Sequence, residues 1–104
     1  MSEFEIAQHV LQCVQQSACA APPAALAMLK PLTRFIRGDG GVHPLELDEA
    51  RSTAFLAICD YAKALHRGQP AGQLWAVAVA ATDQWRALAK RSGCVAQLAL
   101  GAAG

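Results

Sequence analysis

Apolar residues recur at spacings of three and four along most of this chain, a pattern typical of amphipathic helices. The first helix is expected to begin at Ser2-Glu3-Phe4-Glu5, which fits the S-x-x-E capping box, and to end near Cys19. Its broad apolar face consists of the following residues: Phe4, Ile6, Ala7, Val10, Leu11, Cys13 and Val14.

A second helix is expected to begin at Pro22 and Pro23, because a missing N–H costs nothing in the first turn of a helix. Pro31 then removes one backbone hydrogen bond and collides with the carbonyl of Ala27, so this helix should be kinked or broken at Pro31. Apolar residues keep roughly helical spacing across the proline, which favours a kink. The helix is expected to stop at Gly38.

Pro44 can open a third helix, with acidic residues in its first turns and basic residues before a stop at Gly68. A fourth helix is expected from Pro70 to a stop at Gly93. Residues 94–104 are then a short terminal helix or a loose tail.

The fold class follows from these elements. No run of alternating β-branched residues bounded by hairpin turns occurs, so strands are not expected. The short predicted loops favour an up-and-down arrangement of neighbouring helices. We therefore predict an all-α, single-domain bundle of four to five helices over residues 1–104, with the second helix kinked or broken at Pro31.

Composition adds a surplus of apolar residues to this picture. The chain is 54% hydrophobic and 16% charged, whereas an average soluble domain has about 25% charged residues. A small domain with so few charges is expected to leave apolar surface for a partner or a second copy. The formal net charge of +1 argues against binding to nucleic acid or to an anionic membrane.

Four cysteines lie at positions 13, 19, 59 and 94 without a C-x-x-C pair. The acidic N-terminus does not resemble a secretory signal, which favours reduced thiols in a cytoplasmic protein. Cys13 and Cys59 are expected to be buried as small apolar residues. Cys94, after the fourth helix, is the candidate for an exposed, reactive thiol.

The stretch RGDGGVHPLE, residues 37–46, has the cadence of the second half of a calcium-binding EF-hand loop. Such a loop needs side-chain oxygens at its first and third positions, where this chain has Phe35 and Arg37. We therefore interpret Asp39-Gly40-Gly41 as a turn. Because the cysteines also lack the ligand spacing of structural zinc, neither a metal nor another cofactor is expected.

Sequence motifs for catalysis are lacking. The chain has neither a nucleophile elbow nor a phosphate-binding loop, and its glycines do not follow a predicted strand. The three histidines, His9, His43 and His66, are each expected to be solvated. We predict a protein that is not an enzyme and has no catalytic residues.

The fourth helix carries a second apolar face. Trp75 and Val79 lie on a different side of the helix from its main apolar stripe, which consists of Leu74, Ala78, Ala81 and Trp85. A single domain rarely buries two apolar faces of one helix. Either the face with Trp75 and Val79 binds another protein, or the fourth helix is buried on all sides. Tryptophan is enriched where binding energy concentrates, which makes Trp75 the first-choice anchor. On this hypothesis Trp75→Ala weakens association by about 2 kcal/mol and leaves the helical fold largely intact.

Leu56, among polar neighbours on the third helix, and Phe35 are further apolar interface candidates. Arg34 and Arg37 would set register and selectivity. Together these residues favour a non-catalytic helical protein–protein interaction module. We expect a homodimeric regulator, such as an adaptor, an anti-activator or a toxin-neutralising protein, that acts by occluding a partner protein.

Two other functions remain open at this stage. One is a small-molecule or metal-binding bundle in which Cys13, Cys59 and a histidine converge. The other is a DNA-binding transcriptional regulator that uses the basic stripe of Lys30, Arg34 and Arg37. The long loop after Arg37 and the acidic start of the third helix argue against the DNA-binding function.

Overall fold

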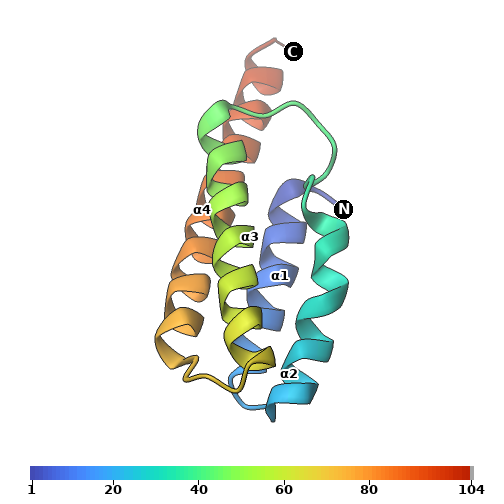
Figure 1. Ribbon diagram of the computed structural model, residues 1–104. Coiled ribbons are helices and arrows are strands. Elements are labelled where there is room, and N and C mark those ends of the chain that lie inside the picture. The colour runs from blue at the N-terminus through green and yellow to red at the C-terminus, as the bar shows by residue number, and fades with distance from the viewer. Residues whose placement is uncertain (104) are drawn as a thin grey trace.

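The computed structural model describes residues 1–103, and the side-chain environment of residues 1–93. Within this part of the chain there are four α-helices, one 3₁₀ helix and no strand (Figure 1). The elements are α1 Glu3–Ser17, α2 Pro22–Leu29, η1 Lys30–Phe35, α3 Leu45–His66 and α4 Gly72–Ala103. The all-α bundle is confirmed, with the smaller of the two expected numbers of helices.

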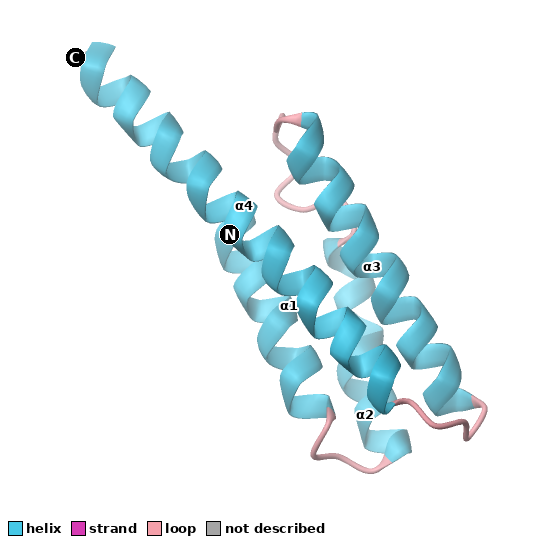
Figure 2. Ribbon diagram, turned by 90° about the vertical axis from the view of Figure 1, so that its left-hand side faces the viewer, coloured by secondary structure: helices cyan, strands magenta, loops and turns pink. Residues whose placement is uncertain are grey.

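The helices pack in up-and-down order. α1 lies between α2 and α4, and α3 also contacts α2 and α4, so α1 and α3 face each other across the bundle (Figure 1). At its C-terminal end α4 continues beyond the other helices (Figure 2).

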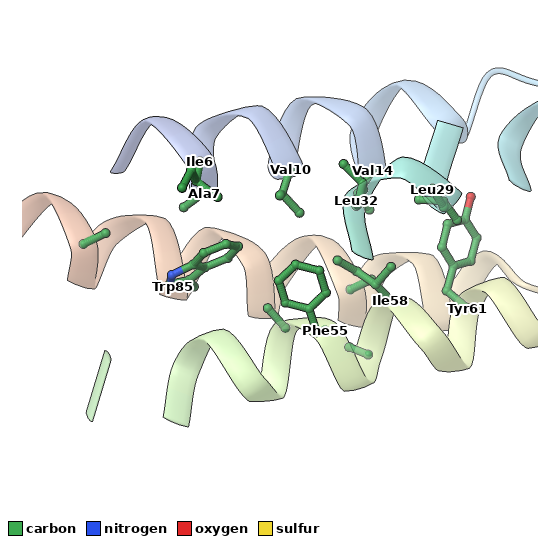
Figure 3. Packing of buried hydrophobic residues seen from close by; sticks show 14 of the residues in the cluster. Ile6, Ala7, Val10, Val14, Leu29, Leu32, Phe55, Ile58, Tyr61 and Trp85 are labelled. Carbon is green, nitrogen blue, oxygen red and sulfur yellow. The ribbon is translucent and has the colours of Figure 1, made fainter. Parts of the chain in front are cut away.

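Trp85 is the largest fully buried side chain, and its ring packs against Phe55 with the centroids 5.7 Å apart (Figure 3). The two rings lie between α1, α3 and α4, where they fill the space enclosed by these helices. Around them pack aliphatic side chains and Tyr61 from α1, α2, η1 and α3; the larger ones are Ile6, Val10, Val14, Leu29, Leu32, Leu47 and Ile58.

The start of α1 confirms the predicted capping box. The amide of Glu5 donates to Ser2 Oγ at 3.2 Å, and the amide of Ser2 donates to Glu5 Oε1 at 3.4 Å. Two backbone N–H groups that lack helical partners are thereby satisfied by side chains.

The second helix breaks near Pro31 and does not continue as the favoured kinked helix. α2 ends at Leu29, and the next six residues form the 3₁₀ helix η1. A 3₁₀ helix turns about 120° per residue and an α-helix about 100°. Over the six residues of η1, the direction of the side chains therefore rotates by about 120° relative to a continuous α-helix. Phe35, expected on the outer side, is therefore half-buried against the core, and Ile36 is 52% exposed.

The predicted stop of the fourth helix at Gly93 is wrong, because α4 passes through Gly93 and continues to Ala103. A glycine inside a helix costs about 1 kcal/mol relative to alanine, which good helix formers around it can offset. A glycine stop requires a left-handed conformation, as Gly68 shows after α3 with φ 68°. The side chain of Cys94 lies outside the described residues.

Candidate functional site

A buried carboxylate occupies one end of the bundle. Glu3, in the first turn of α1, is only 3% exposed. Its Oε1 accepts hydrogen bonds from Arg51 Nε at 3.0 Å and from Trp85 Nε1 at 3.2 Å. Because Arg51 belongs to α3 and Trp85 to α4, this single oxygen joins α1 to both helices.

The second oxygen of Glu3 holds the loop between η1 and α3. Its Oε2 accepts a hydrogen bond from the backbone amide of Asp39 at 2.7 Å. Gly38 has φ 60°, and a Cβ atom at this position would collide with the Glu3 carboxylate. Glycine therefore permits both the left-handed turn and the close approach of the loop to α1 (Figure 1).

Asp39 and His43 complete the inner side of this loop. Asp39 Oδ1 lies 2.8 Å from both the Gly41 amide and His43 Nε2, and His43 Nε2 lies 3.8 Å from Glu3 Oε2. Burial acts to raise the pKa of Asp39, but the hydrogen bonds from His43 and the Gly41 amide outweigh it and lower the pKa. The three side chains thus place one ligand-type atom each within 4.8 Å of one another.

Arg51 is buried between two carboxylates. It is 7% exposed, and besides Glu3 it contacts Asp48 Oδ1 through both terminal nitrogens at 2.8 Å. We refer to Glu3, Asp39, His43, Asp48 and Arg51 as the Glu3 cluster. Apart from His43, its three carboxylates and one guanidinium carry a net charge of −2, which favours a cation.

One side of the Glu3 cluster opens to a pocket of about 520 Å³. Glu3, Asp39 and His43 contribute to the lining, together with Val42 from the same loop and Lys90 from α4. Solvent or a small ligand can therefore reach these polar side chains. Sequence reasoning missed this cluster, although Arg51 offered a signal: it lies on the apolar stripe of α3.

Trp75, the expected interface anchor, is half-buried and packs against the core. Its indole Nε1 donates to the carbonyl of Val14 at 2.8 Å, and the same carbonyl accepts from Ser17 Oγ at 2.6 Å. Ser17 Oγ in turn lies 2.8 Å from the hydroxyl of Tyr61. Trp75 thus satisfies a carbonyl in the last turn of α1, where helical donors run out.

Trp75→Phe is expected to destabilise the folded protein by about 1 kcal/mol, because it keeps an aromatic ring and removes one hydrogen bond. Urea unfolding measures the change, with exposed Gln73→Ala as the control on the same helix. A Trp75→Phe variant as stable as the parent would show that the bond to Val14 contributes nothing.

The other interface candidates occupy three different places. Val79 is half-buried against the core, like Trp75 on α4. Phe35 lies beneath Arg34, whose guanidinium carbon is 4.7 Å from the ring centroid, and its edge-on contact with His9 measures 5.6 Å between centroids. Leu56 is 68% exposed on α3. Arg34 and Arg37 are exposed.

The cysteine expectations are only partly met. Cys13 is half-buried, and burial raises the pKa of its thiol while the charge of Arg34 acts against that rise. Cys59 is exposed, contrary to the prediction, because it lies on the side of α3 that faces solvent. Over residues 1–93, Glu3, Asp39 and His43 form the only potential metal-binding group. Cys13 Sγ lies 3.8 Å from His9 Nε2, but Cys59 does not join them.

Comparison of the chain with known protein families, curated proteins and solved structures returned no match. Among the described residues, no helix combines the length and the apolar character that a membrane span requires.

Proposed function

We propose that the protein is a non-catalytic interaction module that forms a homodimer through the outer face of α3. The observation that carries this proposal is a row of exposed residues on that helix, spaced alternately by four and three. This spacing is that of a coiled-coil seam. We call the row the α3 outer stripe; it consists of Leu45, Glu49, Ser52, Leu56, Cys59 and Lys63.

Two large leucines give the α3 outer stripe its apolar character. Leu45 is 71% exposed and Leu56 is 68% exposed. Leu56 lies at the middle of α3, with eleven residues before it and ten after it in the helix. An antiparallel pair of α3 helices with its two-fold axis at Leu56 would bury both copies of this leucine against each other.

The charges along α3 fit the same antiparallel pairing. Glu49 is seven residues before Leu56 and Lys63 is seven residues after it, so each glutamate would face the lysine of the other copy. Ser52 and Asp60, four residues on either side, would face each other in the same way. The match of Glu49 with Lys63 favours a second copy as the occupant of this face.

The mechanism we propose for the dimer is occlusion of a partner protein. The regulators expected from the sequence, an adaptor, an anti-activator or a toxin-neutralising protein, would act in this way. Arg34 and Arg37 are exposed next to Ile36, away from the α3 outer stripe in the sequence. A basic and apolar surface of this kind suits an acidic partner.

The dimer is tested with Leu56→Asp, which places two carboxylates at the two-fold axis. We expect the dissociation constant to rise at least about tenfold, equivalent to about 1.4 kcal/mol, while helicity is retained. Val77→Asp is the matched control, because Val77 is 52% exposed on α4. Sedimentation equilibrium measures both variants.

If the parent protein stays monomeric at about 100 μM, the dissociation constant of any dimer lies above that concentration. This result would overturn the proposal. Dissociation by Val77→Asp alone would place the contact on α4 instead. The register is tested by Glu49→Lys and Lys63→Glu: each should weaken the dimer, and the double variant should restore it.

A further inference from the structure

We propose that Glu3, Asp39 and His43 form a binding site for a divalent transition-metal ion, with Zn²⁺ as the best fit. The site draws on two segments of the chain, the first turn of α1 and the loop between η1 and α3. It goes beyond the proposed dimer and uses none of the residues of the α3 outer stripe.

The separation of His43 from Glu3 suits a shared ion. Metal–ligand bonds of about 2.1 Å in a tetrahedral site place two ligand atoms roughly 3.4 Å apart. His43 Nε2 and Glu3 Oε2 are 3.8 Å apart, too far for a hydrogen bond and within about 0.4 Å of that separation. His43 Nε2 donates a hydrogen bond to Asp39 Oδ1 at 2.8 Å, and a metal ion would displace this proton.

Glu3 is held in place before any ion arrives. A carboxylate has about four acceptor positions, and three of those on Glu3 accept from Arg51, Trp85 and the Asp39 amide. Oε2, which accepts only one of these three bonds, is the oxygen nearer His43. Hydrogen bonds of this kind orient metal ligands in proteins and raise affinity for the ion.

Charge provides an independent argument for a cation. Arg51 contacts both Glu3 and Asp48 but contributes only one positive charge. Asp39 has no guanidinium partner, so the net charge of −2 on the Glu3 cluster remains. Lys90 also lines the pocket, but its side chain is exposed and its charge is screened by solvent. The excess negative charge therefore lies on the more exposed carboxylates, Asp39 and Asp48, because the buried charges of Glu3 and Arg51 compensate each other.

The type of ligand identifies the class of metal. One imidazole and two carboxylates suit zinc and its neighbours, whereas calcium takes oxygen ligands alone. The RGDGGVHPLE stretch, which lacks the front half of a calcium loop, would obtain its third ligand from Glu3 in α1. Three protein ligands beside an open pocket leave a coordination position for water or a small anion.

The test is titration of the chelator-treated full chain with ZnCl₂ in a calorimeter and with CoCl₂ followed by visible absorption. We expect one ion per chain and a cobalt spectrum without the charge-transfer band of thiolate ligands. His43→Ala should lower affinity by about 100-fold, as should Asp39→Asn, which keeps an oxygen to accept from the Gly41 amide.

His66→Ala is the matched control, because His66 is exposed in the last turn of α3. It should bind the ion as the parent does, and circular dichroism should show that every variant retains its helices. Absence of one-to-one binding at about 1 mM metal would overturn the proposal. Equal loss in His43→Ala and His66→Ala, or a thiolate band, would also overturn it.

Discussion

Gly38→Ala is expected to destabilise the protein by about 3 kcal/mol, although it adds a single methyl group. Part of the cost, about 1–2 kcal/mol, comes from placing alanine at φ 60°. The rest arises because the new Cβ would collide with the Glu3 carboxylate. The loop must then move away and lose the hydrogen bond from the Asp39 amide.

Gly40→Ala is the matched control for this change. Gly40 also has a left-handed conformation, with φ 77°, but a Cβ there would meet nothing within 4 Å. It should therefore lose only the conformational part, about 1–2 kcal/mol. Urea unfolding of both variants measures the difference, and equal losses would mean that the packing of Gly38 against Glu3 does not stabilise the fold.

Glu3→Gln is expected to cost about 3 kcal/mol, because removing one partner of a buried ion pair leaves the other charge without compensation. The affected charge is Arg51, which is 7% exposed and would keep Asp48 alone. The substitution preserves shape, so a cavity does not contribute. Its amide nitrogen would also bring a donor towards another donor, either the Asp39 amide or the Arg51 side chain.

Glu46→Gln provides the control for the loss of one carboxylate charge. Glu46 is exposed in the first turn of α3, so its replacement should change the free energy of unfolding by no more than about 0.5 kcal/mol. Thermal and urea unfolding should rank the two variants in the same order. If Glu3→Gln proves as mild as Glu46→Gln, the Glu3 cluster does not anchor the bundle.

The helices were predictable where the controlling interaction is local. Ser2 and Glu5 form the capping box that their spacing indicates, and Gly68 ends α3 in the left-handed conformation that favours glycine. The missing N–H of Pro31 predicted a kink or a break, with the kink favoured, and the second helix breaks there. Gly93 is the exception. A glycine that ends a helix adopts a positive φ, whereas Gly93 keeps a helical conformation inside α4.

The candidate site was not predictable in the same way. The RGDGGVHPLE stretch resembles half of a calcium loop, in which all ligands come from one segment. Here Asp39 and His43 meet Glu3, which is 36 residues from Asp39 in the sequence. The position of Arg51 on the core stripe of α3 is a signal for a buried ion pair that the sequence analysis did not use, and it would not have identified Glu3 as the partner.

The sequence by itself determined the all-α class, an interruption of the second helix at Pro31 and most helix boundaries, because caps, prolines and apolar spacing act within one or two turns. The tertiary structure alone decided that Glu3 is buried with Arg51 and Trp85, 48 and 82 residues away. It also decided that Trp75 packs against the core. A hydrophobic pattern specifies which face of a helix is apolar, whereas burial depends on which other helix covers that face.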